Sequence, residues 1–280
     1  TTTVSDGYFY QDATARAFRK AGLRALVAQG VIDFPAPGVP DPTRNLAVGQ
    51  GFIERWTGVS DLIRPGLFCH SLTTCSDRTL QEAMKISLAC SLPLQLHLSE
   101  TQEEVEEVLR RTGKPPVAHL KDLGLLSEHL IAVHAVHLED EEIEILAQNK
   151  VGIVHSPESN MKLASGMARI TEMVKKGLVL GLGTDGCASN NNLDLFEEMD
   201  TAAKLDKVRT LDPVNLGAET ALKMATVWGA KVLGLEKEIG TIEVGKKADI
   251  ITVDLRKPHL VPLYNPISTV VYSASGADVK

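Results

Sequence analysis

Val179-Leu-Gly-Leu-Gly-Thr-Asp-Gly-Cys-Ala-Ser-Asn-Asn-Asn192 is the stretch that decides the fold of this chain. An apolar run from Leu178 to Leu182 leads to Asp185, and a loop of small residues then leads to an amphipathic segment. This order is typical of a buried parallel strand that presents one carboxylate at its carboxyl end, where barrel folds keep their functional groups.

Three other apolar runs also end in side chains that can bind a metal or transfer a proton. His70, His97 and His134 each follow such a run, and Glu100 lies three residues after His97. The carboxyl ends of the strands open on one face of a barrel. Four such strand ends in series therefore indicate a single site.

The composition indicates a globular protein with one large domain, or one large domain and a small one. The chain has 280 residues, of which 44% are hydrophobic and 23% are charged. A net charge of −7, without a Lys/Arg cluster, argues against a nucleic-acid partner. No apolar run approaches the roughly 20 residues of a membrane span, and the first residues do not resemble a signal peptide. The cysteines lack C-x-x-C spacing, so we expect reduced thiols in a cytoplasmic protein; they are Cys69, Cys75, Cys90 and Cys187.

Short apolar runs alternate with longer amphipathic stretches, which predicts an α/β fold, a TIM-like (β/α)8 barrel. Strands are expected near 2–7, 23–28, 64–69, 93–97, 130–134, 151–155 and 178–183. Helices are expected near 12–21, 44–57, 77–90, 101–112, 139–149, 166–176 and 193–207. The helix near 101–112 begins with Thr101 as N-cap and ends at Gly113. Seven strands are one fewer than a barrel needs, so either one strand is miscounted or, as we predict, the first strand is absent from this chain.

The end of the chain changes character after a further helical stretch at 213–234. Gly240 to Asp254 reads as two short strands around a turn. We therefore predict a barrel catalytic domain at 1–239 and part of a small β domain at 240–280. The long, proline-rich loop 30–43 is expected on the substrate side.

A metal site is the first interpretation of the strand-end residues. Neutral imidazole from His97 and carboxylate from Asp185 suit Zn²⁺ or Fe²⁺. A single histidine at a strand end is more often structural, and acids such as Glu100 are common in a first helical turn. Asp185 is the stronger signal, because an apolar strand does not need a terminal carboxylate. A catalytic site usually has three protein ligands, and the chain contains no H-x-H motif.

Other motifs favour structural interpretations. His137 cannot leave the strand in the same direction as His134, so we expect it to pack at the start of the next helix. His155-Ser-Pro-Glu-Ser-Asn160 is interpreted as a structural loop whose side chains organise turns. Gly181-Leu-Gly-Thr-Asp-Gly186 matches G-x-G-x-x-G, but Asp185 would stand where a pyrophosphate must approach. No G-x-S-x-G elbow is present.

At these strand ends the sequence resembles the amidohydrolase superfamily, specifically its 5′-methylthioadenosine/S-adenosylhomocysteine deaminases. The resemblance covers nearly the whole chain. The segments that carry it are Leu96-His-Leu-Ser-Glu-Thr101, His134-Ala-Val-His-Leu138, Ser156-Pro-Glu-Ser-Asn-Met-Lys-Leu-Ala-Ser-Gly166, Gly183-Thr-Asp-Gly-Cys-Ala-Ser-Asn-Asn191 and Gly240-Thr-Ile-Glu-Val-Gly-Lys-Lys-Ala-Asp249.

The resemblance implies roles for the residues at the strand ends. His97 and Asp185 would be metal ligands, and Asp185 would also accept a proton from bound water. His134 would stabilise the attacked centre. A divalent metal lowers the pKa of bound water towards about 7 and so supplies hydroxide. Hydroxide attacks the ring carbon that carries the exocyclic amine, Glu100 protonates the adjacent ring nitrogen, and ammonia leaves.

The resemblance also implies a purine nucleoside substrate and one divalent transition metal. We expect zinc, with iron as the alternative. His70, Ser189, Glu100 and Asp185 would contact the substrate. A nucleic-acid or membrane partner is not expected, and a homo-oligomer is left open.

Two departures from the family pattern keep other functions open. The family's H-x-H metal pair is missing from this chain, and Cys69 and Leu72 flank His70-Ser71 where family members usually have prolines. A related amidohydrolase acting on guanine or triazines, as a deaminase or chlorohydrolase, is the first alternative. A truncated, non-catalytic barrel is the alternative from another class.

Overall fold

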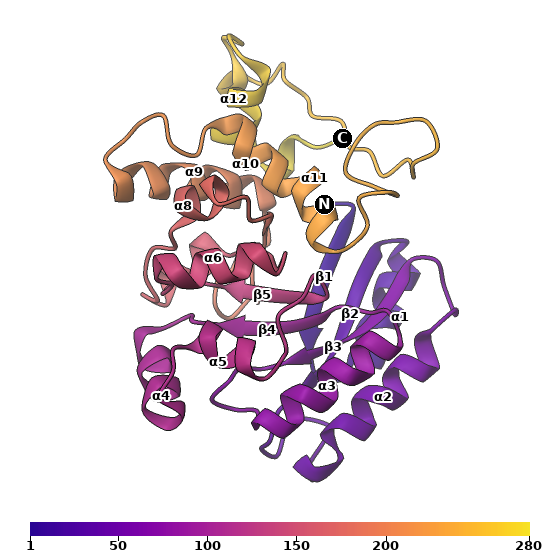
Figure 1. Cartoon of the computed structure of the whole chain (residues 1–280). Helices are drawn as coiled ribbons and strands as arrows, with labels where there is room; N and C mark the ends of the chain where they lie inside the picture. The colour runs from indigo at the N-terminus through magenta and orange to yellow at the C-terminus, as the bar shows by residue number, and fades with distance from the viewer.

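A parallel sheet of seven strands forms the centre of the computed structural model, which describes residues 1–280. Each strand pairs with the next one along the chain, so the order is β1 to β7. The strands turn from upright at β1 to nearly horizontal at β4 and β5 (Figure 1). The strands are β1 (Thr3–Tyr8), β2 (Arg24–Val31), β3 (Ile63–Cys69), β4 (Leu94–Leu98), β5 (Leu130–His134), β6 (Gly152–His155) and β7 (Leu180–Leu182).

Helices connect successive strands on the outside of this curled sheet (Figure 1). The connecting helices are α1 (Gln11–Ala21), α2 (Asn45–Trp56), α3 (Asp77–Ala89), α4 (Gln102–Thr112), α5 (Pro116–Asp122), α6 (Asp140–Gln148), α7 (Pro157–Lys162) and α8 (Ile170–Lys175). After β7 come α9 (Leu195–Thr210), α10 (Ala218–Ala225), α11 (Val227–Val232) and α12 (Pro266–Tyr272), with short 3₁₀ turns at Pro42–Arg44, Pro258–Leu260 and Gly276–Asp278.

The predicted barrel architecture is confirmed as a curled α/β sheet that is open between β1 and β7. Every predicted strand and helix up to residue 207 has a counterpart within a few residues. The end signals of α4 are also confirmed. Thr101 Oγ1 accepts a hydrogen bond from the Glu104 amide at 3.2 Å, and Gly113 ends the helix with φ of 75°. A left-handed φ of this kind costs glycine little, because it has no Cβ.

The two strands predicted within 240–254 are wrong. This segment is irregular, and its only β pairing is a single bridge between Val253 and Val279. Its apolar side chains do not form a covered face, since Ile242 and Val244 are 84% and 108% exposed. A strand needs a hydrogen-bonding neighbour along its length and cover for its apolar face, whereas this segment has a single bridge and leaves Ile242 and Val244 uncovered. The domain boundary at residue 240 stays a prediction.

The main core lies between the sheet and the helices that connect its strands. Leucine and other aliphatic side chains from β3 to β7 pack there against α3, α5 and α6. Leu67, Leu94, Leu96 and Leu130 are each no more than 1% exposed. Continuous burial on both faces is what a parallel sheet covered by helices requires. The strand ends are therefore held in a rigid frame.

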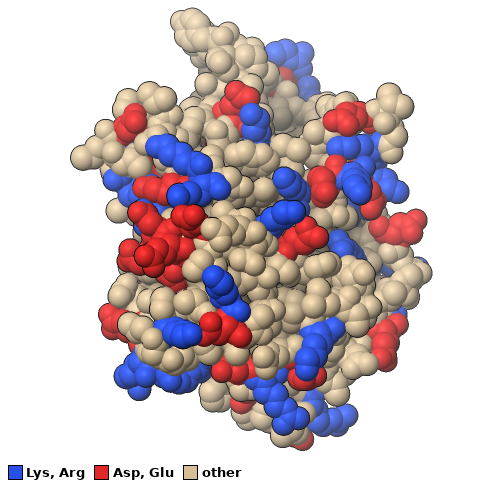
Figure 2. All heavy atoms as spheres, viewed as in Figure 1, with Lys and Arg blue, Asp and Glu red and all other residues tan.

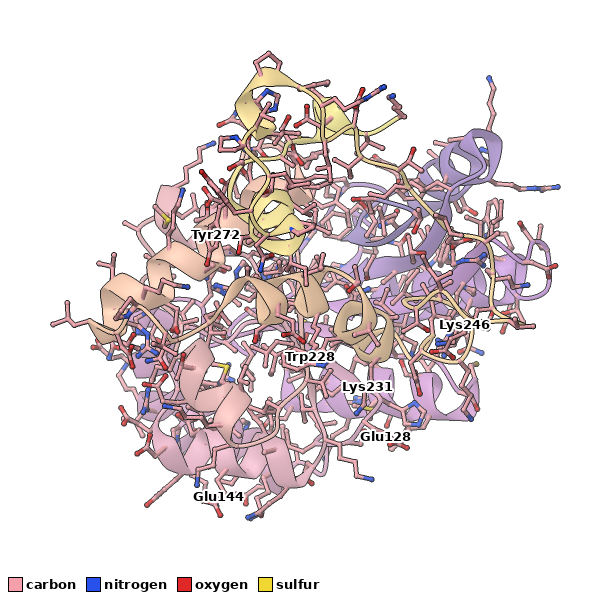
Figure 3. The ribbon with its side chains drawn as sticks, turned by 90° about the horizontal axis from the view of Figure 1, so that it is seen from above. Glu128, Glu144, Trp228, Lys231, Lys246 and Tyr272 are labelled. Atoms are coloured by element: carbon pink, nitrogen blue, oxygen red, sulfur yellow. The ribbon has the colours of Figure 1, made fainter.

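A second cluster joins the last helices to the barrel. Phe196 and Met199 of α9 pack with Leu260 and with Val271 of α12. Figure 3 looks down on this layer and labels Tyr272, over whose ring the Lys207 ammonium lies at 5.7 Å. The C-terminal segment thus rests on α9 and α10.

Acidic and basic side chains are interspersed over most of the face shown in Figure 2, and one group of acidic side chains gathers at its left. The net charge is −7. No helix combines the length and the apolar character that crossing a membrane demands.

Candidate functional site

The register of the strands brings three histidines together at one edge of the sheet. Cys69 pairs with Leu96, so His70 lies opposite His97, and the His70 carbonyl accepts a hydrogen bond from the His97 amide at 3.2 Å. His134 ends β5 beside Leu98. The ring centroid of His97 lies 5.2 Å from that of His70 and 5.1 Å from that of His134.

Glu100 reaches this group from the loop between β4 and α4. Its Oε2 lies 3.7 Å from Nε2 of His134, and Ser165 Oγ donates to its Oε1 at 3.4 Å. Its backbone amide donates to Glu104 Oε2 at 2.9 Å. Burial raises the pKa of Glu104 to about 7. Glu104 therefore fixes the backbone that carries Glu100.

Asp185 follows β7 and is held by three hydrogen bonds. The hydroxyls of Ser159 and Ser189 both donate to Oδ2 at 2.7 Å, and the Gly186 amide donates to Oδ1 at 2.7 Å. Burial by itself raises the pKa of Asp185, but these donors together lower it below its usual value. The carboxylate is thus kept ionised. Asp185 also lies near enough to His97 to oppose the lowering of the pKa of that ring, and the nearby His134 ring helps to lower the pKa of Asp185.

Two buried histidines, His97 and His155, are neutral near pH 7. Burial, together with the neighbouring His134 and His70, lowers the pKa of His97 to about 3. Burial likewise lowers the pKa of His155 to about 3, and its Nδ1 is buried without a hydrogen-bond partner. A neutral imidazole keeps a lone pair free for a metal or a proton.

The segment after β6 contributes contacts that sequence reasoning missed. Asn160 Oδ1 lies 2.9 Å from Nδ1 of His134, and Ser159 bonds Asp185 as described. His137, expected at a helix start, donates instead from Nε2 to the carbonyl of Ser165 at 2.6 Å. The available signal was the position of this segment, directly after a strand end on the edge where the other side chains lie.

Four residues at this edge adopt left-handed backbone conformations without being glycine. Ser99, His134, Ala135 and Asp185 have φ values of 49°, 73°, 49° and 57°. Such conformations cost roughly 1–3 kcal/mol each and concentrate at functional sites. They turn the chain sharply at the ends of β4, β5 and β7.

The donor chemistry of the site fits part of a zinc or iron centre. His97 offers a neutral imidazole and Asp185 an ionised carboxylate. No group of three or more His, Cys, Asp or Glu residues is arranged to hold an ion by itself. These two residues would therefore supply only part of the ligand set of such a centre.

Comparisons with known proteins show the family to which the chain is related. A model described as the amidohydrolase family matches residues 1–280. The chain is 50% identical over 280 residues to a 5-methylthioadenosine/S-adenosylhomocysteine deaminase of Syntrophobacter fumaroxidans, covering 100% of this chain and 64% of the relative. It is 44% identical over 281 residues to a 5′-deoxyadenosine deaminase of Methanopyrus kandleri, again covering 100% and 64%.

A solved structure is similar along the whole chain. The adenosine deaminase of Xanthomonas campestris with bound zinc superimposes with a TM-score of 0.96 at 38% identity, covering 100% of this chain and 63% of that one. The chain thus spans 64% of the length of the curated relatives described above.

Proposed function

The chain belongs to the amidohydrolase family, and we propose that the protein hydrolytically deaminates an adenosine thioether, 5′-methylthioadenosine or S-adenosylhomocysteine. The observation that carries this proposal is the 3.7 Å approach of Glu100 to His134 beside His97 and Asp185. The 50% identical relative is named for the same activity. The neutral imidazoles and ionised carboxylate suit attack by water on an aromatic ring.

His97 and Asp185 are the proposed metal ligands of this chain. A bound divalent metal, which we propose to be zinc, supplies water of lowered pKa. The zinc of the similar adenosine deaminase structure supports this choice over iron. Further ligands would have to come from outside the group that this chain assembles, because His97 and Asp185 form only a partial set.

Glu100, His134 and Asp185 are proposed to move and hold protons. Asp185 accepts a proton from the attacking water, and Glu100 delivers one to the ring nitrogen beside the attacked carbon. His134 lies beside Glu100 and stabilises the oxygen that adds to that carbon. The exocyclic amine takes up the proton held by Asp185 and leaves as ammonia, and the proton of the added hydroxyl returns to Glu100 as the ring carbonyl forms. The products are ammonia and the ring carbonyl compound.

His70 and Ser189 are the proposed substrate contacts. His70 is held by a hydrogen bond between its Nδ1 and Thr74 Oγ1 at 3.0 Å, and burial lowers the pKa of its ring. A neutral His70 can therefore hydrogen-bond a purine without carrying charge. Ser189 Oγ lies against Asp185, so it would meet the substrate beside the reacting atoms.

We also propose a cytoplasmic location, because all four cysteines are free thiols. The proposed partner is the small-molecule substrate.

The proposal is tested by the specificity of the complete protein. Release of ammonia from 5′-methylthioadenosine, 5′-deoxyadenosine, guanine and a triazine gives kcat/KM for each, and this ratio reports transition-state binding. We expect the thioether to be the best substrate. A higher value for 5′-deoxyadenosine would move the assignment to the activity for which the Methanopyrus kandleri relative is named. A triazine faster by about tenfold or more would overturn the proposal.

A further inference from the structure

One short segment touches three functional side chains that come from three different strand ends. Ser159 bonds Asp185, Asn160 bonds His134, and Ser165 bonds Glu100. Sequence reasoning assigned only turn-forming roles to the first part of this segment. The contacts show that its polar side chains point at the site, where they hold the His134 ring and the Asp185 carboxylate.

Asn160 holds His134 at Nδ1, the ring nitrogen that does not face Glu100. Asn160 and His134 are 0% and 1% exposed, so water does not compete for their hydrogen bond. The Asn160 oxygen can only accept, so Nδ1 of His134 must donate across the 2.9 Å that separates them. A neutral His134 then carries its proton on Nδ1 and presents the lone pair of Nε2 towards Glu100.

Ser159 fixes the carboxylate of Asp185 from outside its own loop. Gly186 and Ser189 also donate to Asp185, but they lie within four residues of it and move with it. Ser159 is fully buried on α7 and donates at 2.7 Å from a different element. Of these three donors to Asp185, Ser159 is therefore the one that lies outside the loop after β7.

Other hydrogen bonds hold this segment in place, so it can in turn hold the side chains that it contacts. Glu158 accepts hydrogen bonds from Thr201 Oγ1 at 3.0 Å and from Asn192 Nδ2 at 2.8 Å. The Glu158 amide donates to Glu198 Oε2 at 3.3 Å, and His137 holds the far end at Ser165. Packing against α9 thus sets the place of α7.

We infer that Ser159 and Asn160 are positioning residues: Asn160 sets which ring nitrogen of His134 carries the proton, and Ser159 sets the orientation of the Asp185 carboxylate. Their effect on catalysis rests on the proposed deaminase function. The effect of Ser159 on metal affinity rests on the proposed ligand role of Asp185, and the effect of Asn160 on the histidine proton rests on neither proposal. Partners that orient metal ligands in this way are typically worth 10–100-fold in affinity or activity.

The His134 inference is tested by nitrogen NMR of the complete protein labelled with ¹⁵N-histidine. The His134 signals are assigned by their loss in His134→Gln. We expect Nδ1 to be protonated in the unaltered protein and in Asn160→Asp, which keeps an oxygen acceptor. In Asn160→Ala we expect the proton to be shared between both ring nitrogens, with kcat lowered more than KM is raised. A proton on Nε2 in the unaltered protein, or one kept wholly on Nδ1 in Asn160→Ala, overturns this part.

The Asp185 inference is tested by titrating zinc into the metal-free complete protein. Ser159→Ala should weaken the zinc affinity about 10–100-fold, while Ser159→Thr keeps the hydroxyl and most of the affinity. Ser87→Ala is the matched control, because Ser87 is also fully buried but lies on α3 and its hydroxyl makes no hydrogen bond. Unchanged affinity in Ser159→Ala, or an equal loss in Ser87→Ala, overturns the inference. If the protein deaminates no adenosine derivative, the proposed function fails while the NMR and zinc results still decide this one.

Discussion

Glu100→Gln separates proton transfer from metal binding. The substitution keeps the shape of the side chain and leaves the backbone hydrogen bond to Glu104 intact. Ser165 Oγ can still donate to the amide oxygen, so the fold loses little. What disappears is the titratable group 3.7 Å from Nε2 of His134. General acid–base catalysis contributes about 10²–10⁴-fold, which corresponds to about 2.7–5.4 kcal/mol of transition-state stabilisation at about 1.36 kcal/mol per factor of ten.

The assay measures kcat and metal content on the same preparation of the complete protein. For Glu100→Gln we expect kcat to fall by at least about 10²-fold with the metal content unchanged. Asp185→Asn is the contrasting variant and should lose both activity and bound metal. The carboxylate oxygens of Asp185 accept three hydrogen bonds in the unaltered protein. An amide nitrogen would face one of those donors, at a cost of about 1–3 kcal/mol. Loss of metal from Glu100→Gln, or near-full activity, would refute the assignment.

Three further predictions concern stability. Burial raises the pKa of Glu198 to about 8, so its stabilisation is complete below about pH 4.5 and is lost as the pH rises through about 8. Glu198→Gln should therefore flatten this part of the pH dependence of the urea midpoint, and an unchanged slope would contradict it. Leu120→Ala should cost about 2–5 kcal/mol in urea unfolding, because Leu120 is fully buried; the 46% exposed Leu109 is the control, and equal losses would refute the reasoning. Arg24→Ala removes the 2.9 Å ion pair with Asp249 and should speed proteolysis within 240–257, whereas an unchanged cleavage rate would show that other contacts hold this segment.

The strands could be predicted because local composition and global packing agree there. The run that becomes β2 is buried along its length after Arg24, so its apolar composition reports its environment directly. The helix at Gln102–Thr112 carries its own end signals in Thr101 and Gly113. The approximate boundaries of both elements can therefore be predicted from their own residues.

The elements that were missed or mistaken depend on distant partners. The segment Pro157–Lys162 becomes a helix whose Glu158 bonds Asn192 and Thr201, more than 30 residues away. The alternating apolar residues of 240–254 fit a strand locally, but no neighbouring strand pairs with them. A sequence pattern predicts such elements only when the distant residues that contact them are already known.

In the candidate site, too, the sequence predicts some features and not others. Imidazole and carboxylate at the ends of apolar runs identify the edge of the sheet, since parallel strands share that edge. The pattern does not reveal the hydrogen bonds of Ser159 and Asn160, because both residues are also common in turns. Residue type indicates the chemistry, whereas orientation comes from tertiary contacts.

The strained backbone at the site explains why these contacts have to be strong. Ser99, His134 and Asp185 hold left-handed conformations that a glycine would adopt freely, but a glycine has no side chain to offer the site. Strain of this kind persists only where the surroundings fix the conformation. Asn160 and Ser159 supply such fixing contacts for His134 and Asp185. Removing either contact would let the backbone relax as well as freeing the side chain, so part of the lost hydrogen bond would be offset by released strain. A stability measurement alone would therefore understate what the contact does, and the proton position of His134 and the zinc affinity are the more direct measures.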